Sequence, residues 1–239
     1  MENRSALRQH DRKRISIVIP ALNEEEGIEK TIEAIPRKEL EGMNYEVQII
    51  VVDNDSHDGT GELAKKAGAE VIFEPRRGYG SANKAGFHYA SGDIIAAADA
   101  DASYPVEDIP RLVKLLEIGD LDFVTTDRFT LLEKGVMSFR NRVGNKILTL
   151  AMRLLFRIDI KDSQSGMWVF RKSLLDRMVL KFDTMAFSEE LKVEACYFSK
   201  ARWREVPIEY RARLGEVKLR GWRDGFGNLC CLIKKRITR

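Results

Sequence analysis

The chain has 239 residues, of which 40 are Lys or Arg and 37 are Asp or Glu, and its formal net charge is +3. This length fits one large domain with a substantial core, and the small net charge does not suggest a nucleic-acid binder. The 3 cysteines form neither a disulfide framework nor a CxxC zinc pair, which indicates a reducing compartment.

No stretch of the sequence reaches the roughly 18 apolar residues that a membrane-spanning helix needs. Residues 1–13 are polar and lack the apolar core of a secretory signal, so we expect a polar N-terminal tail. We therefore expect a cytoplasmic protein, either free in solution or peripheral on the cytoplasmic face of a membrane.

Apolar, β-branched runs alternate with helical patterns through the first half of the chain. The runs predict strands at residues 15–19, 47–53, 70–73, 93–99 and 122–126. The helical patterns between them lie at about 24–35, 59–67, 80–90 and 106–116. Such alternation is typical of βαβ units, so the predicted fold class is α/β: a Rossmann-like, mostly parallel sheet flanked by helices, in a single domain over residues 14–225.

Three polar motifs follow predicted strands, at the point where each strand ends. They are PALNEE after the first strand, DNDSHDGT at the end of the second and DADASYP at the end of the fourth. Because ligands collect at the carboxyl ends of parallel strands, we expect the functional site at this edge of the sheet.

Asp99 and Asp101 end a strand of small apolar residues, and the period of two points their side chains the same way. Two converging carboxylates repel each other unless a cation joins them. Oxygen ligands suit Mg²⁺ or Mn²⁺, which commonly share their coordination with substrate phosphates. Two Asp separated by one residue are also common in loops, but the position directly after a strand favours a metal site.

The second motif carries three carboxylates, Asp53, Asp55 and Asp58. Asp58 is expected to be the N-cap of the next helix. Asp53 ends the strand and could accept hydrogen bonds from a base or a ribose. His57, between polar turn residues, is expected to be a solvated loop histidine.

A glycine-containing segment, RRGYGSANKAGF, occupies residues 76–87. Gly78 and Gly80 before a helix would let backbone N–H groups approach a phosphate, assisted by the helix dipole and by Arg76 or Arg77. The segment matches neither a Walker A loop nor GxGxxG, which argues against an ATPase or a dinucleotide enzyme. A plain tight turn explains the glycines equally well.

PALNEEEGI, VVDNDSHDGT, GYGSANKAG and DADASYP occur in this order, and together they resemble glycosyltransferase family 2, which has the GT-A fold. The resemblance spans about residues 14–216. DSQSGMWVFRK (162–172) and YRARLGEVKL (210–219) narrow it to the branch of dolichyl-phosphate mannosyl- and glucosyltransferases. It implies an inverting, metal-dependent transfer of a hexose from a nucleotide sugar, GDP-mannose or UDP-glucose, to dolichyl or another polyprenyl phosphate.

The resemblance also implies site residues. Around the donor nucleotide and its diphosphate we expect Pro20, Ala21, Asn23, Glu24, Asp53, Asp55, Arg77, Gly78, Asp99 and Ala100. Arg211, Arg213 and Lys218 would face the diphosphate or the acceptor phosphate. Asp99 and Asp101 would hold Mg²⁺ or Mn²⁺. The catalytic candidates are Asp101, Arg128, Asp162 and Glu190. Two positions depart from the family pattern, because Ser103 stands where a Gln is frequent and Val217 where a Ser is usual.

The nature of the acceptor decides whether the reaction needs a base. A sugar hydroxyl must lose a proton, and Glu189 or Glu190 could take it. A phosphate monoester is largely a dianion at neutral pH, so it can attack without one. Both glutamates lie early in a helical pattern, where acidic residues also favour the helix dipole.

Two segments of the second half are strongly basic. Residues 133–161 carry a net charge of +5 and residues 211–239 a net charge of +7, which leaves −9 for the rest. The apolar and basic positions at about 135–158 predict an amphipathic helix, either core-facing or interfacial; the resemblance favours an interfacial helix beside the acceptor site. With the basic tail 226–239, it would bind a membrane surface directly or through a membrane subunit.

Two other interpretations stay open. The first keeps the fold and transfers the hexose to a hydroxyl of a glycan or a lipid-linked oligosaccharide. The second is a catalytically silent, membrane-associated subunit, which has no need of Asp99, Asp101, Arg128 and Asp162.

Overall fold

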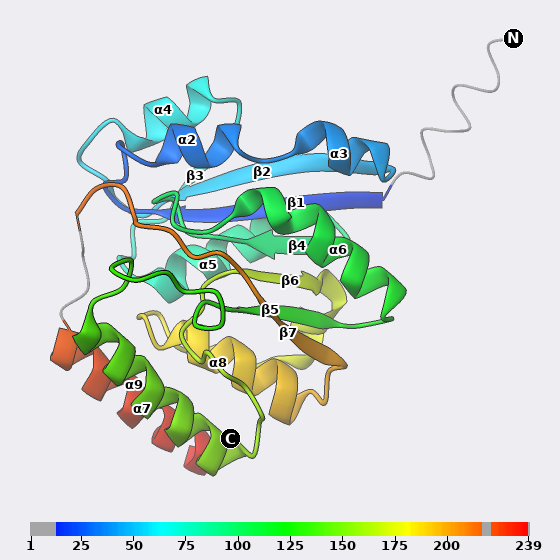
Figure 1. The fold of residues 1–239 in the computed structure, drawn as a ribbon. Helices are drawn as coiled ribbons and strands as arrows, with labels where there is room; N and C mark the ends of the chain where they lie inside the picture. Colours follow the sequence, from blue (N-terminus) through cyan, green and yellow to red (C-terminus); the bar gives the residue numbers. More distant parts are fainter. Residues whose placement is uncertain (1–12, 217–220, 239) are drawn as a thin grey trace, which may run out of the picture.

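A seven-stranded sheet runs through the computed structural model, which describes residues 13–216 and 221–238 (Figure 1). Its strand order is β3-β2-β1-β4-β6-β5-β7, and β6 runs antiparallel to both of its neighbours while the other pairs are parallel. The strands are β1 (Lys13–Ala21), β2 (Tyr45–Asp53), β3 (Glu70–Phe73), β4 (Ile94–Ala97), β5 (Phe123–Asp127), β6 (Trp168–Arg171) and β7 (Trp203–Pro207).

Helices cover both faces of the sheet. One face packs against α2 (Ile28–Glu33), α3 (Arg37–Gly42), α4 (Thr60–Lys66) and α6 (Ile109–Ile118). The other face packs against α5 (Tyr79–Tyr89) and α8 (Phe187–Val193). Alternate residues of β1 serve the two cores, with Ile15, Ile17 and Ile19 on the first and Val18 on the second, as the period of two requires.

The prediction of a mostly parallel α/β sheet is confirmed, and the five predicted strands are present. The sequence patterns did not predict α3, β6 or β7. The helix expected at 24–35 is shorter, because residues 24–27 form turns before α2 begins. β6 is only four residues long and begins two residues after the polar DSQSG segment, so its sequence offers little periodicity.

Two long helices lie side by side beyond the sheet and run in the same direction (Figure 1). The predicted amphipathic helix is α7 (Phe139–Phe156), which starts after Ser138, whose hydroxyl accepts the Asn141 N–H. The segment expected to be a basic tail belongs to α9 (Gly221–Thr238), which packs through the buried Leu232. Among the described residues, no helix is long and apolar enough to cross a bilayer.

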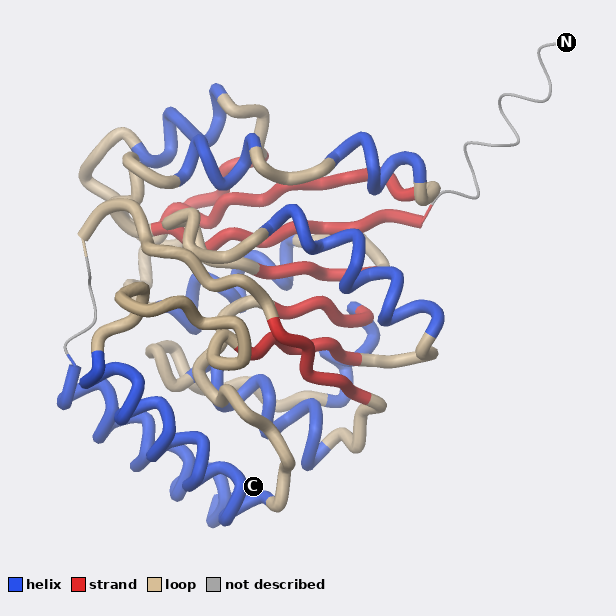
Figure 2. Tube along the Cα trace, in the orientation of Figure 1, coloured by secondary structure: helices blue, strands red, loops and turns tan. Residues whose placement is uncertain are grey.

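The loops that follow β1, β2 and β4 gather at one edge of the sheet (Figure 2). All three strands are parallel, so their carboxyl ends share this edge. The N-terminal ends of α7 and α9 lie toward the same side of the molecule (Figure 1). The fold therefore brings the predicted motifs together and sets the two long helices beside them.

Candidate active site

The loop after β4 carries Asp99 and Asp101 and is held tightly against α2. Thr31 donates its hydroxyl hydrogen to the Ala100 carbonyl over 3.0 Å and accepts the Ala102 N–H, also over 3.0 Å. A Cβ on Gly27 would lie 2.8 Å from the Ala100 oxygen, so only glycine allows this close approach. These contacts fix the backbone that aims the two carboxylates, and Ala100 contributes its backbone rather than a side chain.

The two carboxylates of this loop have different partners. Asp101 Oδ1 accepts the Ser103 N–H over 3.0 Å and the Ser103 hydroxyl, which leaves Oδ2 directed at the site. Asp99 Oδ1 accepts the Tyr79 hydroxyl over 2.9 Å. Burial, together with the nearby Asp101 carboxylate, raises the pKa of Asp99 to about 7, while the Tyr79 hydrogen bond and Arg128 oppose the shift. The charge of Asp101 thus disfavours ionisation of Asp99, and a cation between the two side chains would relieve this repulsion.

The donor set fits a divalent cation that also binds substrate oxygens. The described residues include no group of three or more His, Cys, Asp or Glu side chains arranged to hold a metal. Asp99 and Asp101 would thus be its main protein ligands, and diphosphate oxygens and water would complete the shell. Mg²⁺ and Mn²⁺ take such mixed oxygen shells, and the Ser103 hydroxyl donates to Asp101.

Arg128, at the end of β5, forms a two-pronged ion pair with Asp162. Its Nε and Nη2 donate to the two carboxylate oxygens over 2.7 and 2.9 Å, and both side chains are buried. Burial alone would raise the pKa of Asp162, but the Arg128 guanidinium holds it below its usual value. The guanidinium also lies 5.2 Å from the centre of the Tyr210 ring. Arg128 is therefore a rigid cation near Asp99.

The segment after β7 is bonded to the loop that carries Asp99 and Asp101, and it brings a second arginine, Arg213, to that loop. The Arg211 and Leu214 N–H groups donate to the Ser103 and Asp101 carbonyls. Arg213 Nη2 donates to Glu24 over 2.9 Å, and Nη1 lies 3.5 Å from Asp101 Oδ2.

The side chain of Arg211, expected at the diphosphate, pairs with Glu107 and is exposed. The geometry therefore favours Arg213 over Arg211 as the diphosphate contact. Lys218, with Val217, lies outside the described residues.

The ends of β1 and β2 form the edge where the donor base is expected. The Asn23 side chain accepts the His57 N–H over 2.8 Å, and Asp53 Oδ1 accepts the Ser56 N–H over 2.9 Å. Asp53 Oδ2 has no hydrogen bond among those that the structure shows for the described residues, and Pro20 and Ala21 lie beside it in register with β2. The edge thus offers a free carboxylate oxygen beside partly exposed backbone.

An ion pair between Arg77 and Asp55 lies at this edge of the sheet. Arg77 Nε donates to Asp55 Oδ2 over 2.8 Å, and its Nη2 lies 2.6 Å from His57 Nε2. His57 is exposed, as expected, but it is held by Arg77 rather than only by solvent. Asp58 lies one residue before the N-cap position Gly59, and it still accepts the first helical N–H, that of Thr60.

The glycine segment before α5 does not offer its backbone to a phosphate, which corrects the expectation for Gly78. The Gly78 N–H donates to Asn54 Oδ1 over 2.7 Å. The N–H groups of Gly80 and Ser81 donate to the Asp183 carbonyl over 2.8 and 3.2 Å. A Cβ on Gly78 would lie 2.2 Å from the Asp183 oxygen. The glycines leave room for the backbone of Asp183, and its carbonyl oxygen accepts the N–H groups at the N-terminus of α5.

Glu190 is not placed to act as a base, which corrects its assignment as a catalytic candidate. Its carboxylate accepts the N–H groups of Lys181 and Phe182 over 2.7 to 3.0 Å and the Lys235 ammonium over 2.7 Å. The side chain is fully buried. Lys235 also pairs with Glu194, so this cluster fastens α9 to α8. The signal that could have revealed it is the buried face of α9, which the sequence analysis took for a tail.

Glu189 is the neighbour of Glu190 on α8 and is also buried. One of its carboxyl oxygens has no hydrogen-bond partner among the described residues. Oε1 accepts the Gln164 side-chain amide, and Oε2 has no partner among the described residues. Burial raises the pKa of Glu189 to about 8, so it is protonated at neutral pH. A carboxyl group that already holds its proton cannot accept one from a substrate hydroxyl.

The raised pKa of Glu189 predicts a pH-dependent gain from the Glu189→Gln substitution. In the unfolded chain the carboxyl ionises near its ordinary pKa of 4.5, while in the folded chain the raised pKa keeps it protonated up to about pH 8. Unfolding therefore releases a proton in this window, and wild-type stability falls by up to about 1.4 kcal/mol per pH unit from this group. Thermal melts from pH 5 to 8 should show the variant gaining on wild type as pH rises.

The matched control is Glu190→Gln, which weakens the contact with Lys235 and should lower the melting temperature throughout that range. Parallel wild-type and Glu189→Gln curves would contradict the assignment.

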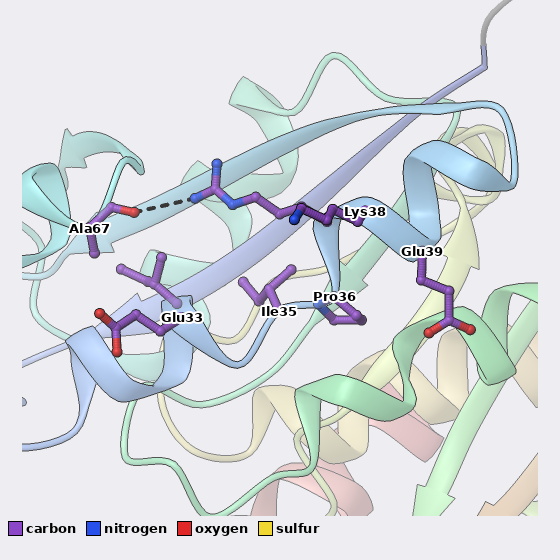
Figure 3. Close-up of a pocket in the computed structure, with 8 residues that line it drawn as sticks. Glu33, Ile35, Pro36, Lys38, Glu39 and Ala67 are labelled. Atoms are coloured by element: carbon purple, nitrogen blue, oxygen red, sulfur yellow. Dashed lines mark hydrogen bonds between the residues drawn. The ribbon is translucent and has the colours of Figure 1, made fainter.

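Two surface hollows lie outside this constellation. The hollow in Figure 3, of about 500 Å³, lies where α2, α3 and α4 approach one another, and Arg37 reaches across it to the Ala67 carbonyl over 3.3 Å. A second hollow, of about 320 Å³, is lined by residues that include Thr31, Ala102 and Arg211. Neither is lined by the Asp99–Asp101 pair or by Arg128, so neither defines the catalytic cleft.

Three tyrosines belong to the site although the sequence analysis did not select them. Tyr79 binds Asp99, Tyr104 accepts the Gly166 N–H over 2.7 Å, and Tyr210 stacks on Arg128. Each lies within a motif that was recognised, but only the structure shows that the three hydroxyl-bearing rings surround the Asp99–Arg128 region.

Comparisons with known proteins show which proteins this chain resembles. The model of the family described as Glycosyl transferase family 2 matches residues 16–179. The low-salt glycan biosynthesis hexosyltransferase Agl6 of Haloferax volcanii is 34% identical over 89% of this chain, which spans about half (51%) of that protein. The dolichyl-phosphate hexose transferase of the same organism is 32% identical over 86% of each chain.

The fold also has close structural counterparts. The glucosyl-3-phosphoglycerate synthase of Mycobacterium tuberculosis, solved with Mn²⁺, UDP-glucose and glycerol 3-phosphate, superposes with a TM-score of 0.72. It covers 96% of this chain and 82% of its own, at 21% identity. At that identity, the likeness establishes the shared fold.

Proposed function

Because the chain belongs to glycosyltransferase family 2, we propose that it is an inverting, metal-dependent transferase that moves a hexose from a nucleotide sugar to a polyprenyl phosphate at a membrane surface. The observation that carries this proposal is the convergence of Asp99 and Asp101 with the cations of Arg128 and Arg213 at one strand edge. The dolichyl-phosphate hexose transferase relative supports the choice of acceptor.

The leaving group explains the two kinds of charge in the site. As the bond between C1 of the hexose and the diphosphate oxygen breaks, its electron pair leaves with the nucleoside diphosphate. A divalent cation held by Asp99 and Asp101 would neutralise part of that charge. Arg128, fixed by Asp162, and Arg213 donate hydrogen bonds to the oxygens that carry the rest. Asp53 and the Asn23 segment would hold the base.

The states of Glu189 and Glu190 favour a phosphate acceptor over a hydroxyl. The two candidate bases of the described chain, Glu189 and Glu190, are respectively protonated and tied to Lys235. A phosphate dianion attacks C1 through an oxygen that already has its electron pair, so no proton needs to be removed. The acceptor charge then calls for cations, which Arg128 and the nearby basic helices supply.

The helices beside the site have the character of a membrane-binding surface. The exposed apolar residues of α7 are Phe139, Val143, Ile147, Leu150 and Leu154, and those of α9 are Phe226, Ile233 and Ile237. Phe139 is 82% exposed, which is unusual for a side chain that only stabilises the fold. Exposed Arg140, Arg142 and Lys146 lie on the same helix, so an anionic lipid surface complements both the apolar and the charged side chains.

The proposed function is tested by a transfer assay with defined substrates. The protein is incubated with polyprenyl phosphate, Mn²⁺ or Mg²⁺, and labelled GDP-mannose or UDP-glucose in parallel, and the organic phase is counted. Lipid-soluble label with one donor is the expected result and identifies the nucleotide. Label transferred only to glycan or oligosaccharide hydroxyls, or no transfer despite tight donor binding, would contradict a phosphate acceptor.

The membrane surface makes a separate prediction. Changing Arg140, Arg142 and Lys146 to Gln should weaken binding to vesicles of phosphatidylcholine and phosphatidylglycerol by on the order of 1 kcal/mol per charge. Sedimentation with the vesicles measures the bound fraction. The matched control changes Lys38, Lys65 and Lys66, which are exposed on α3 and α4 at the far side of the molecule (Figure 1). Equal losses in the two triple variants would show that only net charge matters.

A further inference from the structure

Lys192, on α8, is a charged side chain that the proposed reaction does not use directly. It is fully buried, and its ammonium donates to the Asp162 carbonyl over 2.8 Å and to the Ser165 carbonyl over 2.9 Å. No ion pair joins it to a carboxylate among the described residues. Burying a cation costs free energy, which the attraction of the Asp162 and Glu205 carboxylates beyond ion-pair distance offsets only in part, because burial still lowers the pKa of Lys192.

Glu205, on β7, holds the same loop from another side. Its carboxylate oxygens accept the Lys161 N–H over 2.8 Å and the Asp162 N–H over 3.0 Å. Asp162 therefore has its N–H bound by Glu205 and its carbonyl bound by Lys192. The Glu205 carboxylate and the Lys192 ammonium thus hold the N–H and the C=O of one residue.

The side chain of Asp162 is the carboxylate that orients Arg128. The Asp162 oxygens accept Arg128 Nε and Nη2 and also the Gln164 N–H, over 2.7 to 3.0 Å. Since the pair is buried and two-pronged, a shift of the Asp162 backbone moves the guanidinium with it. Burial lowers the pKa of Lys192 to about 8, so at neutral pH it remains largely an ammonium that can donate both bonds.

We propose that Lys192 is a positioning residue for hexose transfer, which sets the orientation of Arg128 through the Asp162 backbone, with Glu205 as its counterpart. This inference rests on the proposed function, in which Arg128 meets the departing diphosphate. It assigns a purpose to a buried charge that otherwise only weakens the core. It also predicts that the effect of Lys192 disappears when the Arg128–Asp162 pair is absent.

The test is a Lys192→Met substitution with a kinetic and a spectroscopic readout. We expect kcat to fall on the order of 10- to 100-fold while the donor KM stays within about threefold, because a misplaced transition-state contact costs rate rather than ground-state binding. The control is Lys172→Met, which removes a lysine bonded to the Ala90 carbonyl remote from the site and should leave kcat unchanged. An unchanged kcat in the folded Lys192→Met protein overturns the inference.

A double-mutant cycle separates positioning from general destabilisation. In a background with Arg128→Met and Asp162→Asn, adding Lys192→Met should change the residual kcat by less than about threefold. A loss as large as in the wild-type background would show that Lys192 does not act through Arg128. If Lys192→Met fails to fold, Glu205→Gln takes its place and should give a smaller loss of the same kind.

The spectroscopic readout does not depend on transfer activity. The Arg128 Nε–H, buried in its bond to Asp162, should give a slowly exchanging NMR signal that is lost in Lys192→Met and kept in Lys172→Met. If wild type transfers no hexose to polyprenyl phosphate, the proposed function fails while this signal still reports on positioning. A signal that survives in Lys192→Met overturns the inference even if the proposed function stands.

Discussion

An Asp101→Asn protein is expected to fold normally and to lose hexose transfer by roughly 10³-fold or more, the scale of removing a metal ligand and its charge stabilisation. The substitution keeps an oxygen to accept the Ser103 N–H, so the loop should hold its shape. It removes the negative charge of the oxygen that faces the site, 3.5 Å from Arg213. Transfer assays give the rate, and Mn²⁺ titration followed by electron paramagnetic resonance gives the affinity, which should fall in parallel.

The matched control for this experiment is Asp93→Asn, at the opposite end of the same strand. Asp93 accepts the Arg14 N–H over 3.2 Å and is remote from the carboxyl edge of the sheet. It should keep both activity and Mn²⁺ affinity. Transfer by Asp101→Asn at wild-type rate, or wild-type transfer that persists in excess chelator, would refute the role of the carboxylate pair in metal binding.

The sequence was sufficient to predict those parts of the site that depend on local patterns. Five apolar runs predicted strands, and the polar motifs after them predicted which edge carries the site. Asp99 and Asp101 follow β4, and Arg128 follows β5. The two strands end at the same edge of the sheet, so the three side chains come together there. Parallel strands bring consecutive motifs together whatever the intervening sequence, so such residues are the easiest to predict.

The misplaced residues all depend on contacts between distant parts of the chain. Gly78 was expected to approach a phosphate, but the Asp183 carbonyl, more than a hundred residues later, occupies that helix end. Glu190 is a candidate base by sequence alone, but it is paired with Lys235 of α9, 45 residues later. Arg211 and Arg213 lie two residues apart after β7, and only the folded path of that segment, bonded to the Ser103 and Asp101 carbonyls, sends Arg213 to Asp101 and Arg211 to Glu107.

Substitutions at Arg128 and Asp162 separate the effect of this pair on the rate of transfer from its effect on the stability of the fold. Arg128→Met alone should lower transfer by on the order of 10²- to 10³-fold, as expected for removing a donor to developing negative charge. It should also cost about 3–5 kcal/mol of stability, because Asp162 is completely buried and would lose the cation that holds its pKa down.

The double variant with Arg128→Met and Asp162→Asn distinguishes the two effects. Asparagine removes the uncompensated charge and still accepts one backbone N–H, so most of the lost stability should return in chemical denaturation. Transfer should not return, because no cation then faces the diphosphate at this position. Recovery of both stability and activity would mean that Arg128 only supports the fold, and the cation that meets the leaving group would have to be Arg213.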